Sequence, residues 1–151
     1  MTPVIRQLLD TEAAEWGQMR LKLWDDVSEE QNEREIAKAL EDPNYTTFIA
    51  LDGDEKPIGF AEVSIRDYAN GCTEQPVPFL EGIWVDPDYQ RHGIGRLLVD
   101  AVITEMQNRG FHELCSDILE DNQQSHAAHE KWGFEETERV IYFRKSFEAD
   151  A

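Results

Sequence analysis

Basic residues are scarce in this chain of 151 residues, and their shortage excludes one class of partner. Lysine and arginine total 14 against 32 aspartates and glutamates, which gives a formal net charge of −18. Such a surface repels nucleic-acid phosphates before any contact forms, so no nucleic-acid partner is expected. A polycationic ligand would instead be drawn inward by the same field. Acidity that only keeps a small protein soluble is the alternative interpretation.

Long apolar runs and cysteines are also rare. No run approaches the roughly 20 residues that span a bilayer, and no signal-peptide pattern is found, so no membrane association is expected. Cys72 and Cys115 are too few for a disulfide framework, which favours free thiols and a reducing cytoplasm. His126 and His129 lack further ligands at zinc spacing, so no metal is expected. The apolar fraction of 40% suffices for one domain over residues 1–151.

The pattern of apolar residues predicts an α/β (α+β) domain, in which helices flank a mixed central sheet. The predicted strands cover residues 4–9, 46–51, 58–66, 79–85 and 111–117, followed by a β-rich tail at 137–147. The predicted helices cover residues 10–24, 28–40, 93–109 and 122–132. The succession of strand, glycine turn, helix and strand in the middle of the chain is a crossover that favours parallel neighbours.

A carboxylate and a glycine interrupt the apolar strand at 79–85. Glu81 and Gly82 are unusual in such a strand, and a glycine there often marks a bulge or the close approach of another group. Glu81 is therefore a candidate for a functional site. An outward-facing strand residue without a function is the alternative.

The segment YQRHGIGRLLV contains no carboxylate, although the chain is strongly acidic. Arg91, His92 and Arg96 lie at the start of a predicted helix, where free N–H groups attract anions. Gly93 and Gly95 allow the backbone to approach a ligand without interference from a Cβ atom. These features predict a pyrophosphate cradle, and glycines that only form the turn are the alternative. Neither the Walker A pattern nor GxGxxG is present.

The spacing Gln90-x-x-Gly93-x-Gly95 resembles the Q/R-x-x-G-x-G/A motif of the GCN5-related N-acetyltransferases, the GNAT superfamily. The strand FLEGIWVDP is similar to the bulged fourth strand of that family, and Asn122 with HEKWGFEE is similar to its later asparagine and YEKLGF segment. The resemblance implies a single GNAT-like domain with splayed middle strands and acetyl-CoA as co-substrate. It implies that the following residues bind the cofactor: Ile83, Trp84, Val85, Gln90, Arg91, His92, Gly93, Ile94, Gly95, Arg96 and Asn122.

A finer resemblance links the chain to the aminoglycoside 6'-N-acetyltransferases of the chromosomal type. It rests on the segments LWDD, SIRDYANGC, FLEGI and GFEETERVIYFRK. It implies transfer of the acetyl group to the 6'-amino group of a cationic amino sugar, by direct attack in a ternary complex, as in antibiotic resistance. Acetylation of polyamines or protein amines is one alternative, and a CoA-binding module without turnover is another. A homodimer is expected, because edge strands in this superfamily often pair across chains and the tail at 139–147 is β-rich.

The resemblance also implies roles for individual groups. Glu81 and Asp117 would hold the amino sugar and pass its proton to solvent. The backbone N–H of Val85, freed by the bulge, would stabilise the tetrahedral oxyanion. His129 stands where many members have a tyrosine, and it would protonate the departing thiolate. Passive packing of His129, and a cap or solvated loop position for Asp117, are the alternatives.

Three further side chains match positions that line the antibiotic pocket in the resembling enzymes. They are Trp24, Tyr68 and Glu138, the last of which could come from a dimer partner. Trp24 would otherwise be a core residue at a helix end. Tyr68 would otherwise be a surface residue in an Asn-Gly loop.

Overall fold

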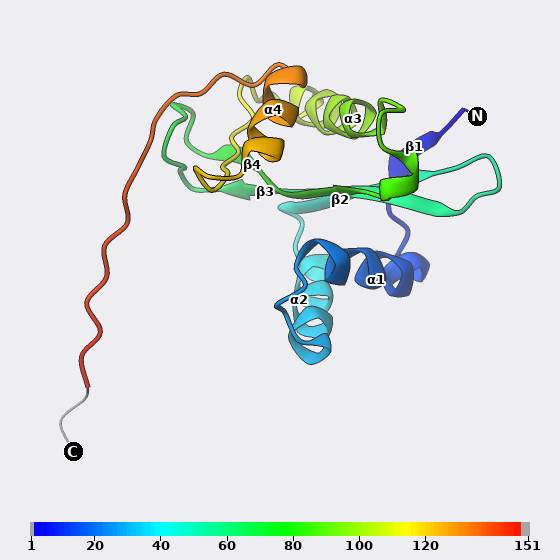
Figure 1. The fold of residues 1–151 in the computed structure, drawn as a ribbon, viewed down its shortest axis with the longest axis horizontal. Coiled ribbons are helices and arrows are strands. Elements are labelled where there is room, and N and C mark those ends of the chain that lie inside the picture. Colours follow the sequence, from blue (N-terminus) through cyan, green and yellow to red (C-terminus); the bar gives the residue numbers. More distant parts are fainter. Residues whose placement is uncertain (1, 149–151) are drawn as a thin grey trace.

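Four antiparallel strands form the centre of a single α+β domain in the computed structural model, which describes residues 2–148 (Figure 1). In the sheet order β1-β2-β3-β4, they span Val4–Gln7, Tyr45–Leu51, Pro57–Arg66 and Val77–Val85. Helices α1 and α2 cover one face of the sheet and helices α3 and α4 the other; they span Ala13–Leu23, Glu29–Glu41, Ile94–Asn108 and Gln123–Lys131. Two 3-10 turns, η1 and η2, span Asp10–Glu12 and Pro87–Tyr89. The α/β (α+β) fold class predicted from the sequence is confirmed.

Each face of the sheet carries its own apolar core. On one face, Leu98 and Val102 of the predicted helical stripe are buried between α3 and the sheet. On the other face, Trp16 of α1 and Ile36 of α2 are buried with Phe60 of β3. Because β2 and β3 are buried on both faces, their sequences are nearly continuous apolar runs instead of alternating patterns. Packing from both sides fixes the register of these strands.

The helix starts predicted from the sequence are confirmed by their caps. Ser28 at the start of α2 and Asn122 at the start of α4 each accept a hydrogen bond from the backbone N–H three residues later. The first helix differs, because residues 10–12 form η1 and the α-helix begins at residue 13. None of the described helices is both long enough and apolar enough to cross a bilayer.

The expected parallel neighbour of β4 is reduced to a single bridge. The four strands run antiparallel, and within the described part of the chain the parallel bridge joins Phe79 to Cys115. The Leu80 N–H donates to the Cys115 carbonyl at 2.8 Å, and the Cys115 N–H donates to the Pro78 carbonyl at 2.9 Å. The strand predicted at 111–117 is therefore wrong in extent, because the chain pairs with β4 at this one point and then diverges from it.

The C-terminal tail forms no strand in the described chain, although residues 137–147 are rich in β-forming residues. It leaves the domain after α4 and extends away from the sheet (Figure 1). Ile141, Tyr142 and Phe143 are 79%, 80% and 91% exposed. No strand of the described chain lies beside the tail, so its backbone groups have no strand with which to form the hydrogen bonds of a sheet.

Candidate functional site

A bulge in β4 turns Glu81 out of the strand ladder. Glu62 of β3 pairs with Gly82, and the next residue, Val63, pairs with Leu80, which leaves Glu81 without an opposite residue. An extra residue of this kind bends the strand and redirects a side chain. The bulge predicted from the Glu81-Gly82 pair is confirmed.

Two side chains of β3 hold the Glu81 carboxylate. Arg66 donates from Nε to Oε2 at 2.9 Å and from Nη2 to Oε1 at 2.7 Å, and the Ser64 hydroxyl donates to Oε2. The guanidinium also stacks on Phe79, 3.5 Å from the ring centroid. The hydrogen bonds to Glu81 raise the pKa of Arg66. These contacts fix the candidate carboxylate in one orientation.

Trp24 packs directly against the bulge. A Cβ atom at position 82 would lie 2.4 Å from the Trp24 ring, so this approach requires a glycine. The ring lies 6.2 Å from Phe60 between centroids, and the Arg20 guanidinium lies 4.7 Å from the ring centroid. The structure thus places Trp24 beside the residue that follows Glu81.

A buried acid lies on the same side of the sheet as Trp24. Glu62 is fully buried. Its carboxylate accepts hydrogen bonds from Trp16 Nε1 at 2.8 Å, from Arg20 Nη1 at 2.5 Å and from the Tyr45 hydroxyl. Burial raises the pKa of Glu62, and the neighbouring Arg20 cation opposes this rise. Burial alone would lower the pKa of Arg20, but the attraction of the Glu62 carboxylate is stronger, so the pKa of Arg20 is raised. The sequence shows the same signal at Glu62 as at Glu81, a carboxylate inside an apolar strand, and sequence reasoning missed it.

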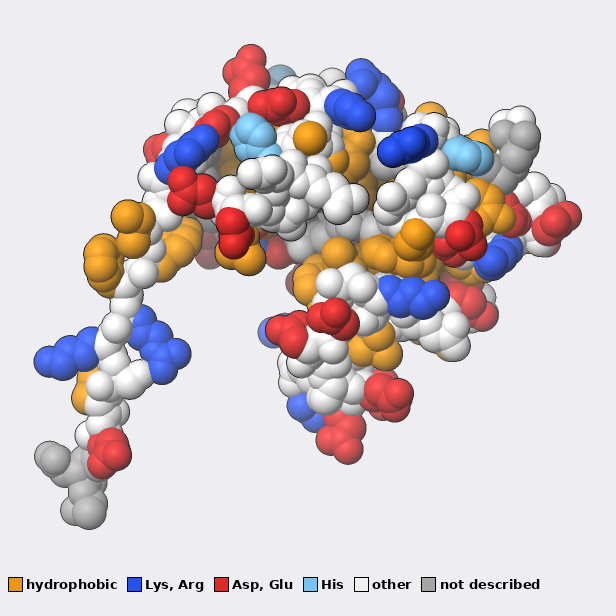
Figure 2. Space-filling model, viewed as in Figure 1, with side chains coloured by type: hydrophobic (Ala, Val, Ile, Leu, Met, Phe, Trp, Pro, Cys, Tyr) orange, Lys and Arg blue, Asp and Glu red, His pale blue; other side chains and the backbone are white. Residues whose placement is uncertain are grey.

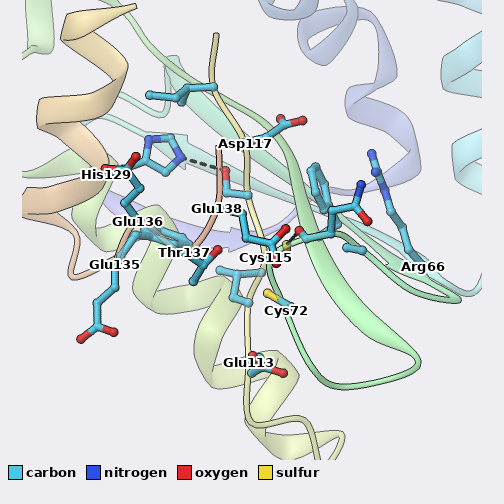
Figure 3. A pocket seen from close by; sticks show the side chains of 18 of the residues that line it. Arg66, Cys72, Glu113, Cys115, Asp117, His129, Glu135, Glu136, Thr137 and Glu138 are labelled. Atoms are coloured by element: carbon cyan, nitrogen blue, oxygen red, sulfur yellow. Dashed lines mark hydrogen bonds between the residues drawn. The ribbon is translucent and has the colours of Figure 1, made fainter. Parts of the chain in front are cut away.

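A cavity of about 1170 Å³ opens between the β3–β4 loop, residues 111–118, α4 and the first part of the tail (Figure 3). It is lined by four of the predicted site residues, which are Tyr68, Asp117, His129 and Glu138. Trp24 and Glu81 are not part of this lining, whereas Arg66 both lines the cavity and binds Glu81. The predicted site residues therefore form two groups, one at the β4 bulge and one in the cavity, and Arg66 joins them.

Both ring nitrogens of His129 are engaged in the described structure. Nδ1 lies 2.8 Å from the Ser125 carbonyl. Nε2 lies 2.8 Å from Ser116 Oγ, the contact drawn as a dashed line from His129 in Figure 3. Since a carbonyl only accepts, we assign the proton to Nδ1, and the neutral ring then accepts from the Ser116 hydroxyl. The ring also packs on Trp132 and Phe134, with centroids 5.3 and 5.0 Å away. His129 thus links α4 to the segment that carries Asp117.

The predicted anion cradle lies at the open start of α3. Arg91 and Gly93 have left-handed backbones, with φ values of 68° and 75°. A Cβ atom at Gly93 would meet nothing within 4 Å, and the first turn of α3 has no side-chain cap. Gln90, Arg91 and His92 are exposed beside it, and basic side chains group over α3 and the preceding loop (Figure 2). The first N–H groups of α3 are therefore available to an external anion.

Gly95, the second predicted cradle glycine, faces a protein side chain. A Cβ atom there would lie 2.8 Å from the Trp132 ring, so this glycine makes room for the residue that ends α4. Arg96 supports the same contact, because its Nη1 donates to the Lys131 carbonyl at 2.7 Å. The cradle segment therefore also anchors α4.

The remaining predicted cofactor residues lie in β4, in α3 and at the start of α4. Ile83, Trp84 and Val85 form the last part of β4 and are half-buried. Ile94 is buried in the core beneath α3, so only its backbone is open to a ligand. Asn122 uses its side chain to cap α4.

Carboxylates join the β3–β4 loop to the segment that follows α3. Glu113 accepts hydrogen bonds from the Thr73 N–H and hydroxyl, both at 2.9 Å, and from the Glu74 N–H at 2.6 Å. Glu74 in turn accepts from the His112 and Glu113 N–H groups at 2.8 and 2.7 Å. This reciprocal clamp holds the two sides of the cavity together beyond the single parallel bridge.

We expect Glu113→Gln to weaken the acid dependence of stability. Backbone donors, first that of Glu74, hold the pKa of Glu113 below its ordinary value. A carboxylate whose pKa is lowered by folding stabilises the folded protein fully at pH values above its unfolded-state pKa of about 4.3. This stabilisation is lost as the pH falls through the folded-state pKa. Urea denaturation at about pH 6.5 and about pH 3.5 will therefore show a smaller loss on acidification in the variant than in the wild type. Glu33→Gln, on the exposed side of α2, should keep the wild-type loss, and the same loss in Glu113→Gln would contradict the clamp.

The histidines and cysteines noted in the sequence have other partners. His126 lies 3.6 Å from Glu130 and 3.7 Å from Glu136. Cys72 and Cys115 are free thiols, and burial raises the pKa of Cys72 to about 12. In the part of the chain that the structure describes, no group of three or more His, Cys, Asp or Glu side chains is placed to hold a metal ion.

Comparison with known proteins gives one consistent group of relatives. The model of the acetyltransferase (GNAT) family matches residues 6–134. The chain is 45% identical over 150 residues to the aminoglycoside N(6')-acetyltransferase type 1 of Stenotrophomonas maltophilia, a match that covers 99% of this chain and 97% of that protein. It is 40% identical over 142 residues to the protein of the same name from Salmonella enteritidis, with 93% and 97% covered.

Solved structures agree with the sequence relatives. The chain matches AAC(6')-Iy in complex with the bisubstrate analogue CoA-S-monomethyl-acetylneamine, with a TM-score of 0.91 and 38% identity over 97% of this chain and 100% of that one. It matches AAC(6')-Iy in complex with CoA with a TM-score of 0.90 and 39% identity over 95% of each chain. The same fold thus recurs in a protein that was solved both with CoA and with a CoA conjugate.

Proposed function

The chain belongs to the GNAT family of acetyltransferases, and we propose that it transfers the acetyl group of acetyl-CoA to the 6'-amino group of aminoglycosides, the antibiotic-resistance reaction. The observation that carries the proposal is the β4 bulge, which turns Glu81 out of the ladder and lets Trp24, at the end of α1, pack against Gly82, on the strand that leads to the start of α3. The names of its relatives support the substrate. The net charge of −18 suits a polycationic amino sugar.

The proposed reaction assigns a task to each group of residues. The open start of α3, with Arg91 and Gly93, binds the pyrophosphate of acetyl-CoA, which supplies the thioester. Glu81 and Asp117 hold the substrate ammonium and take its proton, so that the amine can attack the thioester carbon. The Val85 N–H donates to the oxyanion. Trp24, Tyr68 and Glu138 line the amino-sugar site.

The proton for the departing thiolate is assigned to His129. Ser116 Oγ, 2.8 Å from Nε2, is the next atom on the proposed path. A protonated His129 would reverse this hydrogen bond and let the serine hydroxyl donate outward.

A thiol-release assay with acetyl-CoA and a panel of amines tests the function. Tobramycin, spermidine, a lysine peptide and buffer alone form the panel. Release with tobramycin, followed by mass spectrometry that locates the acetyl group on the 6'-nitrogen, is the expected result. Release with spermidine or the peptide but not with tobramycin would show that the acceptor is a polyamine or a protein amine and not an aminoglycoside. Silence with every amine would overturn the reaction.

We expect Gly93→Asp to raise the KM for acetyl-CoA by about tenfold or more, because it places a carboxylate where the pyrophosphate binds. Gly93→Asn is the matched control, since asparagine has nearly the same size and also tolerates the left-handed backbone. The control should raise the KM far less. Steady-state kinetics with both variants measures this, and equal KM values would remove the cradle assignment.

A homodimer in the cytoplasm completes the proposal. The tail exposes Ile141, Tyr142, Phe143 and Phe147, which a lone soluble chain rarely leaves in water. A second copy that pairs its own backbone with the tail would cover them. The free thiols Cys72 and Cys115 suit a reducing compartment. Sedimentation equilibrium should give twice the chain mass of 17.4 kDa, and a monomer at micromolar concentration would contradict the dimer.

A further inference from the structure

Arg66 has no part in the reaction proposed above, although it binds both oxygens of the Glu81 carboxylate. Its Nε and Nη2 donate to Oε2 and Oε1 at 2.9 and 2.7 Å, a two-point geometry that only arginine offers. The stack on Phe79, 3.5 Å from the ring centroid, holds the guanidinium in this place. Arg66 is therefore a resident cation at the carboxylate that is proposed to hold the substrate.

Few acceptor positions of Glu81 remain for a substrate. A carboxylate has about four lone-pair positions, two on each oxygen. Arg66 takes one on each oxygen, and Ser64 takes the second on Oε2. About one position is left, on Oε1. An entering ammonium group therefore meets a carboxylate whose charge is already balanced and which can accept one more hydrogen bond.

Arg66 joins the cavity to Glu81, because its side chain lines the cavity and also binds the carboxylate. The cavity is lined by Arg66 and Asp117 but not by Glu81. Arg66 and Asp117 extend from different chain segments around this space (Figure 3). An amine that enters through the cavity is repelled by Arg66 and attracted by three cavity carboxylates, Asp117, Glu135 and Glu138.

We propose that Arg66 is a specificity-determining residue for the transferase function proposed above, on which this inference rests. It withholds Glu81 from amines that carry a single charge, because such amines cannot offset the repulsion by the guanidinium. It admits amines whose other ammonium groups bind the cavity carboxylates at the same time, as a polycationic amino sugar can. The basis is the contact between Arg66 and Glu81 at the edge of an acidic cavity.

Selectivity between a polycationic and a singly charged amine tests the proposal. The measured quantity is kcat/KM for tobramycin divided by kcat/KM for Nα-acetyl-lysine methylamide, which carries one ammonium group. Arg66→Gln should lower this ratio by about tenfold or more, mainly through faster reaction of the singly charged amine. Arg66→Lys keeps the charge but loses the two-point contact, and should lower the ratio less. The KM for acetyl-CoA should stay as in the wild type.

A second background shows whether Arg66 acts through Glu81. In Glu81→Gln protein, the added Arg66→Gln change should lower the ratio much less than it does in the wild type, because the carboxylate that Arg66 regulates is absent and only the direct repulsion by the guanidinium is removed. Thermal unfolding of each variant separates a loss of fold from a change of selectivity. A folded Arg66→Gln protein with the wild-type ratio would overturn the inference alone. Wild-type protein that acetylates no aminoglycoside would overturn the proposed function, and the inference with it.

Discussion

Replacing Arg20 with methionine will lower the free energy of unfolding by about 3–5 kcal/mol, because it leaves the buried Glu62 carboxylate without its cation. The Arg20 side chain is 6% exposed and that of Glu62 is 0% exposed, so water does not replace the lost contact. Urea denaturation at neutral pH measures the loss. Arg34→Met is the matched control, since Arg34 lies exposed on α2 and bonds only to Gln31 among the described residues. A loss in Arg20→Met no larger than in the control would contradict the buried pair.

Two further measurements identify the cause of this loss. Adding Glu62→Gln to Arg20→Met removes the uncompensated charge, keeps an acceptor oxygen for Trp16 and offers the Tyr45 hydroxyl an N–H donor, so it should restore part of the stability. In Arg20→Met alone, the pKa of Glu62, which burial already raises, will rise further. A carboxyl group whose pKa is raised by folding destabilises the folded protein least at pH values below its unfolded-state pKa of about 4.3, where it is protonated in both states. The folded protein loses stability as the pH rises and the buried group must become charged. The deficit should therefore be smaller at about pH 4.5 than at about pH 7.

Glu81→Gln should lower kcat/KM for an aminoglycoside by about 100-fold or more, with little change in the KM for acetyl-CoA. The carboxylate is proposed to hold the ammonium and take its proton, and an amide of the same shape does neither at neutral pH. Asp117→Asn should act in the same direction from the cavity side. Kinetics with each substrate varied in turn separates the two KM values.

A cavity carboxylate without an assigned task provides the control for this loss. Glu120 lines the cavity and is 81% exposed, with an ion pair to Arg139. Glu120→Gln should change kcat/KM by less than about threefold, as expected of a screened surface charge. Wild-type kinetics in both Glu81→Gln and Asp117→Asn would place the active site elsewhere.

The features that the sequence predicted well depend on neighbours close along the chain. Ser28 and Asn122 act within three residues, and the apolar stripe of α3 repeats within two turns. The bulge at Glu81 was predictable because a carboxylate followed by glycine interrupts an otherwise apolar strand. Local chemistry of this kind leaves few alternative conformations.

The features that the sequence predicted poorly depend on partners that are distant along the chain. Residues 111–117 have strand composition, but their backbone N–H groups at 112 and 113 donate to Glu74, not to β4. The contact between Arg66 and Glu81 joins the neighbouring strands β3 and β4, and no spacing of residues in the sequence indicates it. The tail has strand composition without a strand beside it in the described chain. In each case the missing information was the identity of the tertiary partner.

Gly95 serves two purposes that are normally assigned to different residues. It lies in the first turn of the helix that is proposed to bind the pyrophosphate, and its missing side chain accommodates the Trp132 ring. A larger residue would press on the Trp132 ring at the end of α4, and a shift of the first turn of α3 that relieved this contact would displace the proposed ligand site. Compensating changes at Trp132 would leave a void against α3. This position is therefore closed to gradual evolutionary drift, and an engineer who seeks altered cofactor preference should leave it untouched.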